Sequence, residues 1–505
     1  MTELNDETLE RHHGPDPRPG AHYANGYACT HTALAAKDAP EGTAVRCAGR
    51  LVLWRPMGGI AFGTIHDRTG RVQISIRKNE LGPEVFKATC AALRIGDFVG
   101  IDGAMWTTEK GESTIGGTEL VLLAPNRRPM PDKWAGISDV EARYRRRFLD
   151  LLYNDESRER FMTRVRVIAF IRRYLDDNGF LEVETPMLIP AASGAAARPF
   201  ITHHNALDID LFLRISPETY LKRLTAGGLE RVYELGRNFR NEGIDASHLQ
   251  EFTMLEWYAA YWSYLDNMDF VEALIRELVL TVTGGTTIER EGVTLDFGPA
   301  FPRIDYRDAV RDGCGVDLRV ARDLESLRAE IKRVGIEIDT DVPTYAALVD
   351  QLYKKTVRPH LIQPCFLVHH PAELVPLARR NDDDPAVLDM FQFVVFGWEV
   401  VKAYSELVDP VEQRTRLEEQ MAMREAGDDE TMMLEEDFLE AMEYGMPPQS
   451  GLGFGIDRFV ALLTGAHTLR DVVFFPQMRD QVRNDADADA DAAASSDDAE
   501  LTPES

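Results

Sequence analysis

The 505-residue sequence contains no run of apolar residues that is long enough to cross a membrane. Its first residues, MTELNDETLERHHGPDP, are polar and acidic, and they do not show the basic and then apolar pattern of a signal peptide. Both absences argue against a membrane protein. We therefore expect a cytoplasmic protein without a membrane partner.

Cysteines are few and widely spaced, and no two of them form a CxxC pair. This spacing argues against a disulfide framework and against a zinc site. We expect ordinary buried thiols at all five positions, which are Cys29, Cys47, Cys90, Cys314 and Cys365.

Positive charge is also scarce, since 56 Lys and Arg residues face 84 Asp and Glu residues and the formal net charge is -28. Such a surplus of acid argues against general affinity for phosphate groups. It does not exclude a local basic patch, such as the arginines of ARYRRR between Arg143 and Arg147.

The length of the chain predicts two or more domains. Residues 43–124 alternate between apolar and polar positions in about five short segments separated by turn residues, which predicts a small β-barrel of the OB type. An N-terminal extension (1–42) precedes this barrel. A polar, Pro-rich linker (125–157) follows it.

Residues 158–480 mix long helical periodicities with scattered strand-like segments and lack a βαβ repeat. This pattern predicts an α+β domain, built on a mainly antiparallel sheet flanked by helices. Gly179 marks the expected end of its first long helix. Residues 481–505 contain little apolar surface to bury, so they predict a disordered acidic tail.

Three segments of the larger domain carry the strongest functional signal: GFLEVETPML (179–188), RVYELGRNFRNEG (231–243) with HLQEFTMLEWY after it, and GLGFGIDRFVALL (451–463). In this order and spacing they resemble motifs 1, 2 and 3 of class II aminoacyl-tRNA synthetases. EFTMLE, AYSELVDP and EYGMPP resemble the lysyl-tRNA synthetases within that class. The resemblance extends from the barrel to about Arg479, and the combination is specific although FRNEG alone would be weak.

An enzyme of this class would bind ATP as a substrate and join a carboxylate to its α-phosphate, so a fixed cation must lie between two anions. The resemblance gives this role to Arg240, whose guanidinium is always charged. It places Glu242 at the adenine, stacks the base on Phe252 and assigns the triphosphate to His248 and Arg458. Gly451, Gly453 and Gly455 would allow close approach of the chain.

Each of these residues also has a simpler interpretation when it is taken alone. An Arg and a Glu two positions apart on a strand share a face and often form only a surface ion pair. A Gly-rich segment before a helix is often only a turn. The conjunction of the motifs favours the functional interpretation.

The resemblance also predicts a pocket for one long cation. Glu406 would accept the ε-ammonium group with help from Tyr258, although Tyr258 could instead be a core tyrosine. Glu218 and the backbone near Gly194 would bind the α-amino group, and Tyr404 would cover the side chain. The complete set that it assigns to L-lysine is Gly194, Glu218, Arg240, Glu256, Tyr258, Lys402, Tyr404 and Glu406.

The sequence departs from the family at two positions. The family has a carboxylate where this chain has Gln392, and this carboxylate would share Mg²⁺ with the residue that matches Glu399. It has a small polar residue, commonly asparagine, where this chain has Lys402. Because Mg²⁺ prefers hard oxygen ligands, we expect Glu399 as the remaining metal ligand and fewer Mg²⁺ ions than is usual for the family.

Three interpretations of Lys402 are open. It can replace part of a metal ion by neutralising phosphate or carboxylate, it can fill the amino-acid pocket and exclude lysine, or it can pair with Glu399 and leave function unchanged. The motif 2 loop departs as well, with Ser247, Leu249 and Gln250 at positions that contact ATP and the acceptor end of tRNA in the family.

The barrel residues indicate which RNA the protein binds. In the family, this domain recognises the anticodon by stacking its bases on an aromatic side chain and by hydrogen bonds to the base edges. Phe62, Gln73 and Glu112 occupy the matching positions, although Phe62 could also belong to the barrel core. Their presence predicts tRNA(Lys) as a partner.

Taken together, the resemblance implies a homodimeric lysine–tRNA ligase, with Pro186 of motif 1 near the dimer interface. Two alternatives remain. One is a paralogous ligase with a different amino acid or acceptor. The other is a catalytically inactive tRNA-binding regulatory protein.

Overall fold

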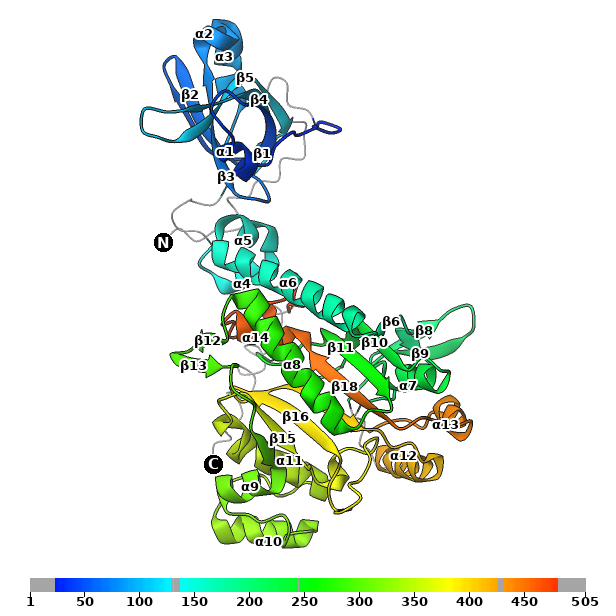
Figure 1. The fold of residues 1–505 in the computed structure, drawn as a ribbon. Helices are drawn as coiled ribbons and strands as arrows, with labels where there is room; N and C mark the ends of the chain where they lie inside the picture. Colours follow the sequence, from blue (N-terminus) through cyan, green and yellow to red (C-terminus); the bar gives the residue numbers. More distant parts are fainter. Residues whose placement is uncertain are drawn as a thin grey trace, which may run out of the picture. The chain divides into compact units, whose positions relative to one another are not determined.

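The computed structural model describes residues 23–128, 130, 137–195, 197–243, 245–425 and 431–479. The chain divides into two compact units, Met1–Gly136 and Ile137–Ser505 (Figure 1). The acidic tail and most of the N-terminal extension that the sequence predicts lie outside the described residues. The finer domain boundaries stay predictions.

The first unit is a closed barrel with the strand order β1-β2-β3-β5-β4. Alternate side chains of its strands are buried, as a barrel with a packed interior requires. The predicted barrel is therefore confirmed. Its strands are β1 (Ala44–Met57), β2 (Ile60–His66), β3 (Arg71–Arg77), β4 (Phe98–Thr107) and β5 (Ser113–Ala124), and its helices are α1 (Ala33–Lys37), α2 (Lys78–Leu81) and α3 (Pro83–Ala92).

The second half of the predicted linker is helical rather than a plain connection. It forms α4 (Val140–Arg145) and α5 (Arg147–Tyr153). Arg147 is buried and its Nη1 lies 2.5 Å from Asp150, whose other carboxylate oxygen is 2.9 Å from Nε of Arg143. These two arginines therefore neutralise a buried carboxylate.

The second unit is built on an eight-stranded sheet with the order β14-β15-β16-β17-β18-β11-β10-β6. The two outermost pairs are parallel and the five inner pairs are antiparallel, which confirms the predicted α+β class. Its strands are β6 (Leu181–Glu182), β10 (Arg231–Phe239), β11 (Glu251–Ala260), β14 (Arg303–Asp305), β15 (Cys365–Val368), β16 (Met390–Val395), β17 (Trp398–Ser405) and β18 (Gln449–Gly455).

Helices α6 and α8 pack against each other, and α8 covers one face of the large sheet (Figure 1). The core between them contains Leu274 and Leu278 of α8 with Phe454 of the sheet. The helices of this unit are α6 (Asp155–Asp177), α7 (Glu218–Ala226), α8 (Tyr264–Thr283), α9 (Tyr306–Cys314), α10 (Leu324–Val334), α11 (Tyr345–Thr356), α12 (Pro410–Glu425), α13 (Glu436–Glu443) and α14 (Ile456–Leu463), with short 3₁₀ turns η2 (Arg358–His360), η3 (Ala372–Leu374) and η4 (Leu469–Asp471).

Local sequence sets the ends of the two main helices. Helix α6 ends at Asp177, and Gly179 follows with φ +78°, as the sequence predicts. Helix α8 begins with a capping box between Ser263 and Asp266, and it ends at Gly284 in the left-handed region. Small sheets complete the unit: β7 (Leu188–Ile189), β8 (Ile201–His204) and β9 (Ile209–Leu213) in the order β7-β9-β8, and β12 (Thr287–Arg290) with β13 (Val293–Asp296).

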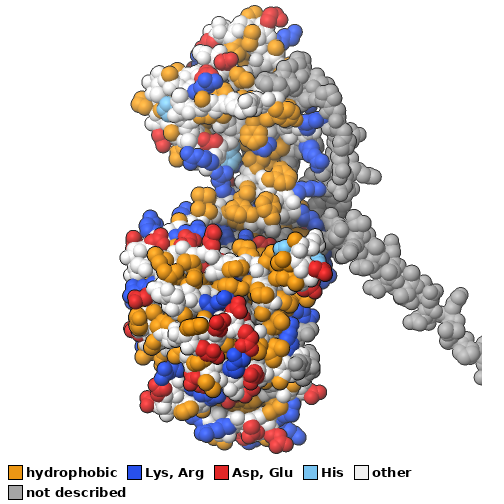
Figure 2. All heavy atoms as spheres, turned by 90° about the vertical axis from the view of Figure 1, so that its right-hand side faces the viewer, with side chains coloured by type: hydrophobic (Ala, Val, Ile, Leu, Met, Phe, Trp, Pro, Cys, Tyr) orange, Lys and Arg blue, Asp and Glu red, His pale blue; other side chains and the backbone are white. Residues whose placement is uncertain are grey.

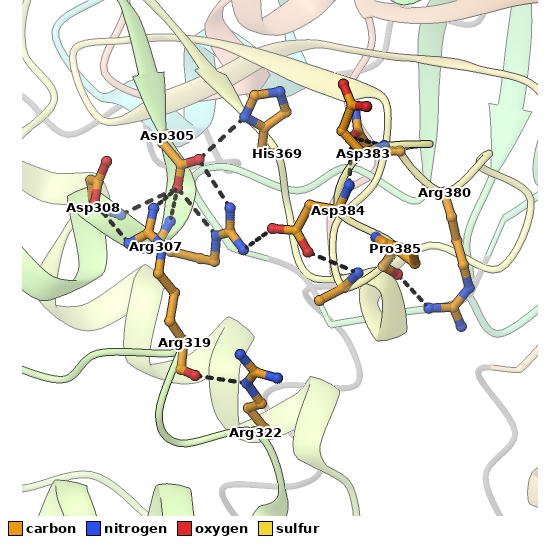
Figure 3. Close-up of polar contacts among 12 residues, drawn as sticks. Asp305, Arg307, Asp308, Arg319, Arg322, His369, Arg380, Asp383, Asp384 and Pro385 are labelled. Atoms are coloured by element: carbon orange, nitrogen blue, oxygen red, sulfur yellow. Dashed lines mark hydrogen bonds and ion pairs between the residues drawn. The ribbon is translucent and has the colours of Figure 1, made fainter.

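A cluster of ion pairs at the β14 edge fixes the start of the helical segment α9–α11 (Figure 3). Asp305 contacts Arg307, Arg319 and Nδ1 of His369. Arg307 also lies 2.6 Å from Asp384 in the loop before β16. Burial acts against ionisation of Asp305, but these partners hold the pKa of its carboxyl well below the usual range. The cluster has a structural role and lies outside the cavity described next.

Candidate active site

A cavity of about 290 Å³ opens on the large sheet of the second unit. Its walls come from the 194–195 loop, the start of α7, strands β11, β17 and β18, the loop before β11 and the start of α14. Twelve predicted site residues line it: Gly194, Glu218, Arg240, Glu242, His248, Phe252, Glu256, Tyr258, Glu399, Lys402, Tyr404 and Arg458. Tyr258 therefore faces a cavity and is not only a core residue.

One part of the cavity carries two arginines. Arg240 follows β10 directly, and its guanidinium lies over the ring of Phe252, 5.1 Å from the ring centroid. Burial lowers the pKa of Arg240, and the nearby charge of Arg458 lowers it further. Such a pair of cations is a favourable place for an anionic group.

Arg458 is held in place from two sides. Its Nη1 donates to the backbone oxygen of Glu399 at 3.0 Å, and its Nη2 lies 3.4 Å from Nε2 of His248. The other ring nitrogen of His248 lies 2.8 Å from Asp245. The predicted triphosphate residues are thus neighbours, although they come from different motifs.

Gln250, one of the residues that differ from the family, forms hydrogen bonds across the motif 2 loop. Nε2 of Gln250 donates to the backbone oxygens of Glu242 and Gly243, at 3.1 and 3.0 Å. Gln250 is buried, so these bonds are shielded from water. In this chain Gln250 fixes the shape of the loop.

The deep part of the cavity is lined by carboxylates. Tyr404 donates from its hydroxyl to Oε1 of Glu218 at 2.7 Å, and Ser216 donates to Glu256 at 2.8 Å. Burial and the charge of Glu218 raise the pKa of Glu256 to about 8. Acceptors therefore converge here on the space that a cationic ligand would need.

Glu406 lies behind this wall and does not line the cavity. Its fully buried carboxylate is ion-paired with the ammonium of Lys222, which also lies 2.7 Å from Oε1 of Glu218. The sequence interpretation missed Lys222. The signal was present, because Glu218 and Lys222 are four positions apart at the start of a helix.

Two glycines leave room for this arrangement. A Cβ at Gly194, which has φ +83°, would meet Cβ of Glu218 at 3.2 Å and Cβ of Ser216 at 3.3 Å. A Cβ at Gly451 would overlap the ring of Tyr258 and the carboxylate of Glu406. Gly451 is therefore required for packing beside the carboxylates, whereas the sequence interpretation placed it at the phosphates.

Lys402 and Gln392 face each other across β16 and β17. Nε2 of Gln392 donates to Oε2 of Glu399 at 2.5 Å. In the described part of the chain, no carboxylate lies within ion-pair distance of Lys402. The interpretation that Lys402 pairs with Glu399 is therefore wrong. Lys402 also does not fill the space beside Glu406, because Lys222 is the ammonium there.

The residues predicted to read the anticodon lie on one part of the barrel. Phe62 and Gln73 project from the same face of neighbouring strands, since Phe62 pairs with Ser75 and Gln73 pairs with Thr64. Thr114, two residues after Glu112, donates to Oε1 of Gln73 at 3.2 Å. Lys37 lies 3.5 Å from Glu112.

Two features are absent from the described residues. No helix there is long and apolar enough to span a membrane. No group of three or more His, Cys, Asp or Glu residues there is arranged to hold a metal ion.

Known proteins resemble this chain over most of its length. Residues 139–479 match the family model of "tRNA synthetases class II (D, K and N)", and residues 45–126 match "OB-fold nucleic acid binding domain". A lysine–tRNA ligase of Pelotomaculum thermopropionicum is 44% identical over 90% of this chain and 91% of its own. Those of Enterococcus faecalis and Haemophilus influenzae are 48% and 46% identical, over 86% and 87% of this chain and 87% and 88% of theirs.

Proposed function

The chain belongs to the class II tRNA synthetases of the D, K and N group, and on this premise we propose that it is a lysine–tRNA ligase. It activates L-lysine with ATP and transfers the lysyl group to tRNA(Lys). The observation that carries this proposal is the cavity, which joins two arginines at one part to a cluster of buried carboxylates and tyrosines at the other.

The arginines support the activation step. A carboxylate oxygen of lysine attacks the α-phosphorus of ATP, the bond to the β-phosphate oxygen breaks and pyrophosphate leaves. Arg240 neutralises the carboxylate and the α-phosphate, while Arg458 and His248 hold the leaving phosphates. Glu242 and Phe252 bind the adenine. A ribose hydroxyl of the tRNA end then attacks the adenylate carbonyl, and AMP leaves.

The carboxylates support selection of lysine. Glu218 and the backbone at Gly194 bind the α-amino group, and Tyr404 covers the side chain. Tyr258 faces the ε-ammonium, and the charge of Glu406 attracts the ε-ammonium from behind the cavity wall. Glu256 supports this arrangement through Ser216. An uncharged amino acid would leave buried polar groups without partners, which is costly.

The family implies Mg²⁺ near the phosphates, but the residues present do not fit a Mg²⁺ ion held between two protein carboxylates. The side-chain amide nitrogen of Gln392 donates a hydrogen bond to Glu399. A hydrogen-bond donor therefore occupies the position where the second carboxylate ligand of the metal would lie. Glu399 is then the only remaining metal ligand of the predicted pair.

Lys402 supplies a fixed positive charge in its place. It lines the cavity, faces Gln392 and has no carboxylate partner among the described residues. Burial lowers the pKa of His370 to about 3, and the positive charge of Lys402 contributes to this lowering. The ammonium is thus available to the phosphates or the lysine carboxylate.

The barrel supports tRNA(Lys) as the partner, since Phe62 can stack on a base and Gln73 and Glu112 can bond base edges. The same function makes the cytoplasm the expected location.

A homodimer is supported by apolar side chains at the surface. Met162 and Val165 on α6 are 46% and 50% exposed, and Leu188 and Ile201 on the small β7-β9-β8 sheet are 47% and 65% exposed. The side that bears this small sheet, turned to the viewer in Figure 2, carries many hydrophobic side chains among charged ones.

The decisive experiment is ATP–pyrophosphate exchange with each standard amino acid, followed by aminoacylation of tRNA(Lys). Exchange that depends on L-lysine and charging of tRNA(Lys) are the expected results. Exchange with another amino acid would favour the paralogous ligase. Salt-sensitive tRNA binding without any exchange would favour the regulatory protein.

A further inference from the structure

Lys222 of α7 is a fully buried lysine beside the amino-acid pocket. Its ammonium forms ion pairs with Glu218 and Glu406, and it lies within 5.8 Å of the ring centroids of Tyr258, Tyr404 and Phe438. Burying an ammonium group away from water costs free energy unless carboxylates and aromatic rings surround it. Here both are present.

The two carboxylates are those on which the proposed function relies for the two ammonium groups of lysine. Lys222 does not saturate Glu218, because Lys222 and Tyr404 both contact Oε1. Among the described residues, Oε2 of Glu218 has no hydrogen-bond partner, and Glu218 lines the cavity. A carboxylate offers about four acceptor positions, so an incoming ammonium can still bind.

Charge explains why such a residue is useful. Burial raises the pKa of Glu406, and the ammonium of Lys222 opposes this rise. Burial also acts to lower the pKa of Lys222, but the charges of Glu218 and Glu406 raise it above its ordinary value. A buried glutamate without a cation would take up a proton and would lose its attraction for an ammonium.

We propose that Lys222 is a positioning residue that determines amino-acid specificity. Its ammonium bridges Glu218 and Glu406, holds the two carboxylates at a fixed separation and so selects an amino acid with two ammonium groups. This inference rests on the proposed lysine activation, because it assigns the second carboxylate to the ligand's ε-ammonium.

The test is ATP–pyrophosphate exchange with Lys222→Met, which removes the charge at similar volume, and with Lys222→Arg, which keeps it. Lys354→Met is the matched control, since Lys354 is an exposed lysine in an ion pair with Asp350 on α11. The assay measures kcat and KM for L-lysine and for L-norleucine, which has the same side chain without the ammonium.

We expect Lys222→Met to raise the KM for lysine about tenfold or more while kcat stays within about threefold, because only binding of the cation weakens. The ratio of kcat/KM for lysine to that for norleucine falls at least about tenfold. Lys222→Arg raises the lysine KM by about threefold, because the larger planar guanidinium cannot hold the carboxylates of Glu218 and Glu406 at the same separation. Lys354→Met behaves like the wild type.

An unchanged lysine KM, a lower one or an equal loss for lysine and norleucine would overturn the inference. If Lys222→Met does not fold, Lys222→Arg decides, and a lysine KM equal to that of the wild type would then refute the spacing role. Failure of the proposed function looks different, because the wild type itself would then show no lysine-dependent exchange.

Discussion

Replacement of Lys402 by asparagine tests the claim that a side chain does the work of a metal ion. Lys402 has no carboxylate partner among the described residues and is only partly buried. Its removal therefore leaves no carboxylate unpaired. We expect the free energy of unfolding to change by less than about 1 kcal/mol.

The effect on catalysis is expected to be much larger. Two unit charges about 4 Å apart interact by about 4 kcal/mol at an effective dielectric constant of about 20. The cavity is partly open to water, so we take about 3 kcal/mol, which corresponds to roughly 100-fold in rate. A phosphate or carboxylate that meets the ammonium in the transition state would lose this stabilisation.

The assay is lysine-dependent ATP–pyrophosphate exchange across a Mg²⁺ titration. The wild type should need Mg²⁺ only to complex ATP, and Lys402→Asn should be about 100-fold slower throughout. The double variant Gln392→Glu/Lys402→Asn restores a second carboxylate beside Glu399, so its exchange should regain a dependence on Mg²⁺ in excess of ATP. Lys354→Asn, at the surface of α11, is the control.

Exchange by Lys402→Asn within about threefold of the wild type at every Mg²⁺ concentration would refute the reasoning. A wild type that already needs excess Mg²⁺ would refute it as well.

Three further predictions address other parts of the chain. Gly451→Ala should destabilise the fold by about 1–3 kcal/mol in a denaturant titration and raise the lysine KM, because its Cβ overlaps Tyr258; Gly285→Ala, with no atom within 4 Å of its Cβ, is the control and should change neither. Glu256 has a pKa of about 8, above its ordinary value, so its contribution to stability is fully present below about pH 4.5 and is lost as the pH rises through 8. The melting temperature of Glu256→Gln, relative to that of the wild type, should therefore rise between pH 5 and pH 9. A difference in melting temperature that stays constant with pH would contradict the raised pKa of Glu256. Phe62→Ala should raise the KM for tRNA(Lys) about tenfold or more and leave pyrophosphate exchange unchanged, since one stacked base is worth about 1–3 kcal/mol; equal loss of both activities would contradict an anticodon role.

The sequence by itself determined the elements and their order. Alternating apolar residues specify the strands of the barrel, and Gly179 ends α6, because these signals act between residues close in the chain. The resemblance in motifs 2 and 3 also predicted residues that line the cavity, such as Arg240, Glu242 and Arg458, because related sequences fold in the same way.

Only the tertiary structure decided which charges meet. Glu406 is distant from Lys222 in sequence, and the sheet and α7 bring the two together in a place without water. Arg143 and Arg147 pair with Asp150 for the same reason. Lys402, in contrast, is left without a carboxylate partner among the described residues. Ionic partners depend on contacts between distant segments and on burial, and neither can be read from local pattern.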